Sequence, residues 1–335
     1  MALELINLIS KMRLTDKIAN IAVAFETKIG GERAGMIYMV FALAAYQSMT
    51  TFVKVTSGRI NVYHTSFLRG FFHFLFSYYL NLETKTPCIH PNLKTNHRII
   101  VRNIIGSIHN LILTYLISRI PYSEIFTFVI LGPLVVSLMD FLINKTVYKK
   151  IELFSLFLGI FGLLTIVKPE LIYGIPPKQS HAASGIDYAQ GLERTLLMCL
   201  MVFSIIIWSY SNLMLKSFKN VSTITVNFSI GGILAVLSGL GIAFSGKVSQ
   251  LTFNEYLGAF FFAGFASFIS QLFYARAFQK GKPGHVAMIL GTQLLFTMCF
   301  ESIYLAEIPT YLDLFGATLT MSSNILVALF AVNKK

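Results

Sequence analysis

Ten apolar segments recur along the chain, and each is long enough to cross a lipid bilayer. A membrane-spanning helix needs about 20 mostly apolar residues, because the hydrocarbon offers no water to its backbone. The predicted spans cover residues 35–53, 62–82, 99–118, 123–143, 151–167, 195–215, 224–244, 256–277, 286–305 and 312–331. This pattern predicts an all-α membrane protein with ten transmembrane helices.

The charge content supports the same class of protein. Only 13% of the 335 residues are charged, whereas a soluble domain has about 25%. The net charge of +12 raises the question of nucleic acid binding. The basic residues, however, lie at the ends of apolar segments, as topology signals do, so we expect no nucleic-acid partner.

The distribution of Lys and Arg predicts the sidedness of the chain. With the N-terminus inside, 19 of the 27 basic residues fall on inner segments and seven on outer segments, and Arg69 lies within a span. Basic residues concentrate on the cytosolic or matrix side of membrane proteins. Both termini are therefore predicted to lie on that side, which an even number of spans also requires.

Residues 1–34 precede the first span and are predicted to form an amphipathic N-terminal extension. One helical face is apolar, whereas basic and acidic residues occupy another. The apolar face consists of Leu5, Leu8, Ile9, Met12 and Ile18. This pattern favours a helix that lies on the inner membrane surface or docks a partner, either in a homodimer or in a larger membrane protein complex. A weakly bound, frayed tail is the alternative interpretation.

The spans divide into two repeats, 35–168 and 195–332, joined by a Gly-, Pro- and Ser-rich loop at 169–194. The ends of both repeats show one succession: a basic turn with a proline (Pro121, Pro283), a span, a polar break, and a span with a central glycine (Gly159, Gly316). Five spans per repeat place the two copies in opposite orientations. Inverted repeats of this kind are typical of alternating-access transporters.

Several short motifs in these repeats resemble a known family. The motifs are YARAFQKG at 274–281, LAE at 305–307, LFGA at 314–317, LRG at 68–70 and FLGIFG at 157–162. On these segments the chain resembles the EamA-type ten-helix members of the drug/metabolite transporter superfamily. The resemblance implies solute transfer through a central cavity lined by helices 1–4 and 6–9. The first repeat departs from the family pattern, since Asn144, Lys145, Lys149 and Lys150 replace its turn glutamate.

Ionisable residues within the spans are the first candidates for function, because a central charge costs about 2.5–3.5 kcal/mol on insertion scales. Arg69 lies about 10 Å into its span, at 1.5 Å per residue, and His73 follows one turn later on the same face. They are predicted to contact an anion in the cavity or to serve as structural partners. Glu301, in the ninth span, is a candidate proton- or cation-binding group, or a salt-bridge partner of Arg69 or Arg276.

Uncharged polar residues complete the predicted substrate site. Amides are difficult to justify in lipid, so Gln47, Asn110, Gln271 and Gln293 are expected to face the cavity. Helix-to-helix hydrogen bonds are the alternative role for such residues. Glu124 and Asp140 lie near helix ends and are interpreted as structural.

Other kinds of site have little support in the sequence. Cys88, His90 and His97 share a loop, but their spacing matches no zinc pattern, so no metal site is predicted. The sequence contains no recognisable catalytic or nucleotide-binding motif. We therefore expect no enzymatic activity and no cofactor.

The sequence therefore predicts a secondary transporter of a small polar or anionic metabolite, with membrane lipids and that solute as its partners. The alternative is a transporter-like fold kept as a non-transporting structural subunit of a larger membrane complex, such as one in the mitochondrial inner membrane. The N-terminal extension, the missing glutamate and the weak polarity of the predicted cavity favour this alternative.

Overall fold

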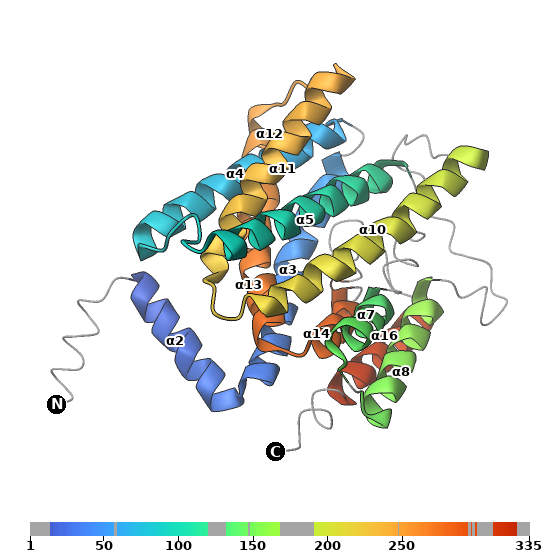
Figure 1. Cartoon of the computed structure of the whole chain (residues 1–335). Coiled ribbons are helices and arrows are strands. Elements are labelled where there is room, and N and C mark those ends of the chain that lie inside the picture. The colour runs from blue at the N-terminus through green and yellow to red at the C-terminus, as the bar shows by residue number, and fades with distance from the viewer. Residues whose placement is uncertain are drawn as a thin grey trace, which may run out of the picture.

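The computed structural model describes residues 14–56, 59–119, 132–146, 148–167, 191–246, 248–293, 296, 299 and 311–326. Every regular element in these ranges is helical, which confirms the predicted all-α class (Figure 1). The helices are α2 (Leu14–Ile29), α3 (Gly31–Thr56), α4 (Val62–Thr84), α5 (Leu93–Arg119), α7 (Gly132–Asn144), α8 (Lys150–Val167), α10 (Gly191–Ser217), α11 (Thr223–Ser245), α12 (Phe253–Gly258), η1 (Ala259–Phe265), α13 (Ala266–Lys280), α14 (Pro283–Ile289), η2 (Leu290–Thr292) and α16 (Tyr311–Leu326).

Five of the described helical stretches are long and apolar enough to cross a membrane. They are Gly31–Val53, Leu93–Ile117, Leu192–Ser217, Thr223–Ser245 and Phe253–Lys280. The eighth predicted span is not one regular α-helix, because η1 is a π-helical segment between α12 and α13. The first part of the fourth span, the loop at 168–190, Glu124 and most of the ninth span beyond Gln293 lie outside the described residues.

Polar side chains set the starts of corresponding helices in the two repeats. The Asn61 side chain accepts a hydrogen bond from the Tyr63 N–H at the start of α4. The Ser222 side chain accepts one from the Ile224 N–H at the start of α11. Asn and Ser favour this position because their oxygen satisfies an N–H that has no partner within the helix.

Helices of the first repeat pack mainly against helices of the second. Contacts between the halves include those of α4 with α11, α3 with α13, α8 with α16, α5 with α10 and α7 with α14. Exchange of the two repeats replaces α3, α4, α5, α7 and α8 by α10, α11, α13, α14 and α16, respectively. This exchange leaves three of the pairs unchanged and converts the α3–α13 pair into the α5–α10 pair. The contact pattern is therefore that of two structurally related halves.

Glycines allow α4 and α11 to approach closely. A Cβ atom on Gly70 would lie 2.5 Å from the Ala235 nitrogen, and one on Gly231 would lie 2.6 Å from the Phe74 nitrogen. Both obstructing atoms belong to the backbone, which has little freedom to move. Small residues at such contacts are a common device of membrane helix pairs.

Replacement of Gly231 by alanine is expected to destabilise the protein by about 1–3 kcal/mol, the usual cost of overpacking. Gly239→Ala is the matched control on the same helix, since its Cβ would meet only the Phe67 ring at 3.7 Å. The free energy of unfolding, measured by denaturant titration in micelles, tests the difference. Equal stability of the two variants would contradict the close backbone contact.

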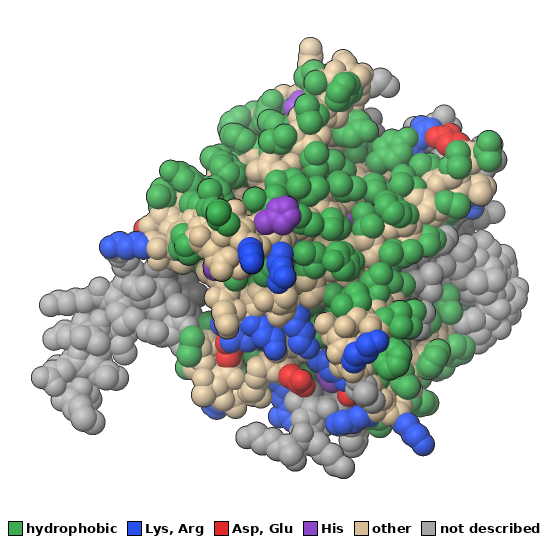
Figure 2. Space-filling model, in the orientation of Figure 1, with side chains coloured by type: hydrophobic (Ala, Val, Ile, Leu, Met, Phe, Trp, Pro, Cys, Tyr) green, Lys and Arg blue, Asp and Glu red, His purple; other side chains and the backbone are tan. Residues whose placement is uncertain are grey.

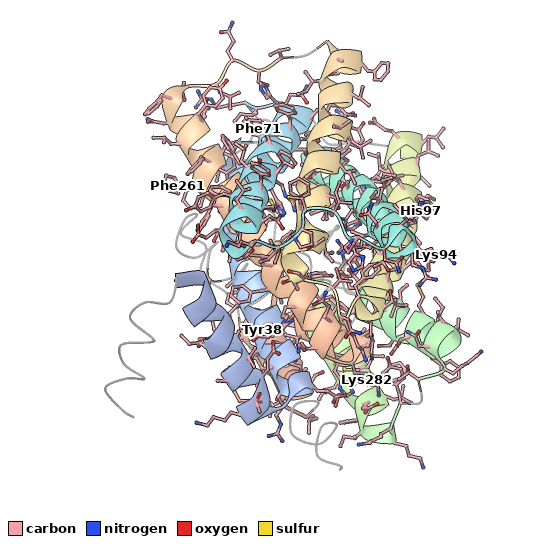
Figure 3. The ribbon with its side chains drawn as sticks, turned by 60° about the vertical axis from the view of Figure 1, so that its left-hand side comes forward. Tyr38, Phe71, Lys94, His97, Phe261 and Lys282 are labelled. Atoms are coloured by element: carbon pink, nitrogen blue, oxygen red, sulfur yellow. The ribbon has the colours of Figure 1, made fainter. Side chains whose placement is uncertain are left out.

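The surface divides into a broad apolar region and a basic end. Hydrophobic side chains cover most of the view in Figure 2, whereas Lys and Arg gather toward its lower part. Phe71 and Phe261, which are 41% and 55% exposed, lie in the upper part of Figure 3, and Lys282 lies near the bottom. We call the end of the bundle that contains Lys282 and α2 the basic end. Large exposed apolar side chains above it suit contact with lipid.

Helix α2 lies at the basic end and leads directly into α3 (Figure 1). Four of the five residues predicted for the apolar face of the N-terminal extension, Leu5, Leu8, Ile9 and Met12, lie outside the described residues. Within α2, Ile21 and Val23 are exposed, whereas Glu26 is buried. The described part of the extension is therefore a helix that is held to the bundle near its C-terminal end.

Candidate functional site

A cavity of about 90 Å³ lies between the two halves of the bundle. Its polar lining comes from α3, α5, α10, α13 and the residue after η2. These residues are Tyr46, Thr50, Arg102, His109, Asn110, Trp208, Ser211, Asn212, Ser270, Gln271, Tyr274 and Gln293. No Asp, Glu or Lys side chain lines the cavity among the residues that the structure describes. The cavity surface is largely apolar, since the lining also includes Leu43, Leu113, Ile117, Ile205, Ile230 and Leu290, and it contains a cation without a facing carboxylate.

One face of α5 forms a long side of the cavity. Arg102, Gly106, His109 and Asn110 all line it, and their spacing places them on one stripe of an α-helix. The His109 Nδ1 lies 2.7 Å from the Ser204 Oγ, and the Asn110 Nδ2 donates to the Gly106 carbonyl at 2.8 Å. These hydrogen bonds orient both side chains at the cavity surface.

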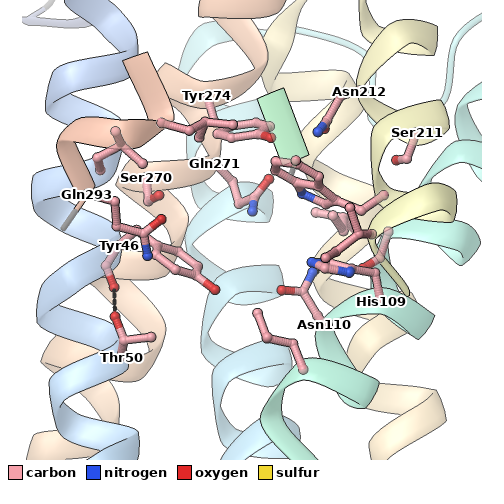
Figure 4. Close-up of a pocket in the computed structure, with 18 of the residues that line it drawn as sticks. Tyr46, Thr50, His109, Asn110, Ser211, Asn212, Ser270, Gln271, Tyr274 and Gln293 are labelled. Atoms are coloured by element: carbon pink, nitrogen blue, oxygen red, sulfur yellow. Dashed lines mark hydrogen bonds between the residues drawn. The ribbon is translucent and has the colours of Figure 1, made fainter. Parts of the chain in front are cut away.

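The opposite side comes from α3 and α13. In Figure 4, Tyr46 and Gln293 lie on one side and His109 and Asn110 on the other, with Gln271 between them. The Thr50 hydroxyl donates to the Tyr46 carbonyl at 2.9 Å, so it is satisfied within its own helix. The cavity therefore presents aromatic and amide groups from both halves to a common space.

Arg102 is the only charged side chain in the described lining. It is 3% exposed, and its Nη1 donates to the Asn103 Oδ1 at 2.7 Å. Asn103 in turn donates to the Val226 carbonyl at 2.7 Å. Because Asn103 is neutral, it orients the guanidinium without cancelling its charge.

The residues predicted for the site separate into two groups. Asn110, Gln271 and Gln293 line the cavity. Arg69, His73 and Gln47 are buried but are not part of the described lining.

Arg69 and His73 lie among the packed helices instead. The Arg69 Nε donates to the Ser267 Oγ at 2.8 Å, and the His73 ring packs edge-on against Phe268 at 5.7 Å. Glu301 lies outside the described residues. Arg276, its suggested partner, pairs with Glu26.

Arg102 is one of the 19 basic residues predicted for the inner segments, but the structure places it inside α5 and beside the cavity. The signal was present in the sequence. Arg102 precedes Gly106 by four residues and His109 by seven, so all three share one helical face. Asn212 and Tyr274, which are polar residues of the predicted spans at 195–215 and 256–277, also line the cavity.

An ion-pair cluster joins the two halves at the basic end. The Lys282 Nζ donates to the Glu152 Oε2 at 2.9 Å, and the His285 Nε2 lies 3.1 Å from the Glu152 Oε1. Glu152 belongs to α8 of the first half, whereas Lys282 and His285 border and begin α14 of the second. Asp140 bonds nearby to the side chains of Asn144 and Tyr148, in agreement with its interpretation as a structural residue.

A second cluster holds α2 to α13. The Arg276 Nε and Nη2 donate to the two oxygens of Glu26 at 2.7 and 2.9 Å, and the Lys280 Nζ lies 2.7 Å from its Oε2. Burial alone raises the pKa of the Glu26 carboxyl, but its bonds to Arg276 and Lys280 outweigh burial and lower that pKa below its ordinary value of 4.5. Glu26 is therefore ionised at neutral pH.

No group of three or more His, Cys, Asp or Glu side chains that could hold a metal ion occurs within the described ranges. Cys88, Cys199 and Cys299 are free thiols. The cavity between the halves is thus the strongest site for a small molecule.

Comparison with known proteins agrees with this architecture. The family model described as the EamA-like transporter family matches residues 33–168 and 195–329. A solved structure described as "Crystal structure of protein" is similar with a TM-score of 0.72 and 12% sequence identity, over 90% of this chain and 98% of that one. No match was found among curated proteins. The chain therefore belongs to the EamA-like transporter family, which is part of the drug/metabolite transporter superfamily.

Proposed function

We propose that the protein is a secondary transporter that moves a small polar or anionic solute by alternating access. Ten spans in two inverted five-helix repeats would cross the membrane, and the basic end would face the cytosol or matrix, in agreement with the positive-inside rule. The observation that carries this proposal is the cavity between the halves, since both halves contribute polar side chains to its lining.

The clusters at the basic end support a cavity that is closed on that side. The contact between Glu152 and Lys282 joins the first half to the second, and Glu26 joins α2 to α13. Alternating access requires contacts of this kind at one end to separate while those at the other end form. Ion pairs suit the task because charged partners that separate at an aqueous face become hydrated.

Replacement of Gly106 by leucine is expected to reduce solute flux to the background of protein-free liposomes. Gly106 lines the cavity, and a Cβ atom there would lie 3.5 Å from the Ser211 Oγ, so a longer side chain fills the space that the solute needs. The measurement is uptake into proteoliposomes that are preloaded with metabolite pools, with and without a pH gradient.

Ile108→Leu is the matched control, because Ile108 lies on the same helix and is 38% exposed on the side away from the cavity lining. It is expected to transport like the unmodified protein. The absence of flux in the unmodified protein, with every pool and pH gradient, would count against transport.

A second candidate function is a structural subunit of a larger membrane complex. The exposed Ile21 and Val23 on α2, at 68% and 56%, favour it because they offer apolar surface to another chain. Purification in mild detergent separates the two functions. Stoichiometric recovery with a large complex supports the subunit, whereas recovery as a monomer or homodimer supports the transporter.

A further inference from the structure

Three buried hydrogen-bond donors of the cavity lining have no acceptor within the described structure. They are the Nε–H of Arg102, the side-chain amide nitrogen of Asn212 and the hydroxyl of Tyr274. Arg102, Asn212 and Tyr274 are 3%, 1% and 9% exposed, respectively. Buried donors in folded proteins are almost always paired, so three such groups on one cavity indicate a missing acceptor.

The three donors line the same cavity. The charge of Arg102 acts on Tyr274, and the Asn212 side chain interacts with the Tyr274 hydroxyl. Figure 4 shows the Tyr274 ring directed toward the side on which Asn212 lies. One bound group with several acceptor oxygens would therefore meet all three.

The electrostatics favour an anion as that group. Arg102 lines the cavity, and the charge of Arg69 acts on Tyr46 and His109, which are also part of the lining. No carboxylate faces these two cations in the described lining. A buried charge without a counter-charge is costly inside a membrane protein, and a bound anion would supply it.

We propose that the cavity binds the oxyanion of a small solute, either a carboxylate or a phosphate, through Arg102, Asn212 and Tyr274. This inference rests on the proposed transport function and narrows its solute to an anion. Arg presents planar N–H groups that match the oxygens of both oxyanions. A cavity of about 90 Å³ is several times the ~10–15 Å³ that a single water requires, so it has room for a small oxyanion such as acetate or inorganic phosphate.

Calorimetric titration of the full chain in detergent tests this proposal directly. The probes are acetate, inorganic phosphate, chloride and acetamide, the last a neutral analogue of acetate. Acetate, phosphate or both are expected to bind, and the pattern identifies the oxyanion, whereas chloride and acetamide are not expected to bind. Arg102→Gln is expected to weaken binding by about 10- to 100-fold, the usual effect of losing a charged hydrogen-bond partner.

Arg98→Gln is the matched control, since Arg98 lies one turn away on α5 and is exposed. It is expected to bind the oxyanion like the unmodified protein. Where Arg102→Gln fails to fold, Tyr274→Phe and Asn212→Leu each remove one neutral donor and are expected to weaken binding about three- to tenfold. The proposal is overturned by absent oxyanion binding, by equal affinity for chloride or acetamide, or by unchanged affinity in folded variants.

Counterflow of the same probes in proteoliposomes separates this inference from the transport function. Oxyanion binding without flux would refute transport and leave the site intact. Flux of a neutral solute without oxyanion binding would retain transport and refute the site.

Discussion

Replacement of Glu152 by glutamine is expected to lower the free energy of unfolding by about 3 kcal/mol, the cost of breaking a buried ion pair by removing one partner. Glu152 is 2% exposed, and one of its oxygens accepts from both the Lys282 Nζ and the Lys149 N–H, each at 2.9 Å. Its other oxygen faces His285. Denaturant titration in micelles measures the loss.

Two controls define the source of this loss. Glu193→Gln removes a carboxylate from an ion pair with Arg119 in which both partners are partly exposed, so its expected cost is below about 1 kcal/mol. In the double variant Glu152→Gln/Lys282→Met, the stability should recover in part, because the buried charge is then removed with its partner. Equal effects of Glu152→Gln and Glu193→Gln would contradict a buried ion pair.

The same Glu152 variant has a consequence for access to the cavity. Ser270→Cys places a thiol on the lining, in a background where Cys88, Cys199 and Cys299 are replaced by serine. If the Glu152 cluster closes the basic end, Glu152→Gln should raise the rate at which a membrane-impermeant thiol reagent from that side labels the cysteine. A change of at least about tenfold is expected, which corresponds to 1.4 kcal/mol. An unchanged rate would show that the cluster does not control access.

Replacement of Glu26 by alanine is expected to release α2 from the bundle. The Glu26 carboxylate is held by Arg276, Lys280 and the Tyr38 hydroxyl, and charged hydrogen bonds of this kind are worth about 1.5–3 kcal/mol each. Hydrogen–deuterium exchange of the α2 amides should therefore accelerate by at least about tenfold. Exchange in α5, far from this contact, serves as the internal control.

Acid should also release α2 from the bundle, because protonation of the Glu26 carboxylate removes its charge. Docking lowers this pKa below 4.5, so the carboxylate stabilises the docked state at pH values above the ordinary pKa. This contribution is lost as the pH falls through the lowered pKa of the docked state. The protection of the α2 amides, measured relative to the intrinsic exchange rate at each pH, should thus be high at pH 5 and 7 and fall below about 4.5. In Glu26→Ala this fall in protection should be absent, and its persistence would contradict this role for Glu26.

Sequence reasoning identified some of the residues that line the cavity but could not separate them from residues buried between helices. Asn110, Gln271 and Gln293 were predicted to face a cavity because an amide in lipid lacks hydrogen-bond partners, and the structure places all three in the lining. Gln47 satisfies the same argument but lies outside the lining. The argument identifies polar residues that avoid lipid, and a cavity and a helix interface both meet that condition.

For Arg69 and Arg102, too, position in the sequence did not distinguish a cavity residue from a residue packed between helices. Depth within a span singled out Arg69, which the structure places against Ser267. Arg102 lies near the start of its predicted span at 99–118, which suggested a topology signal, but α5 begins at Leu93 and Arg102 lines the cavity. Distance along one helix does not report which neighbouring helix faces a side chain.

The sequence by itself determined the class of the protein, the repeated order of its helices and the concentration of charge at one end. These properties follow from local physics, because a helix must be apolar along its whole length to remain in lipid. Only the tertiary structure decided which polar residues share the cavity and which charges pair. Those contacts join helices that are distant in the chain, such as α8 with α14 or α2 with α13, and no local pattern specifies the partner of a buried charge.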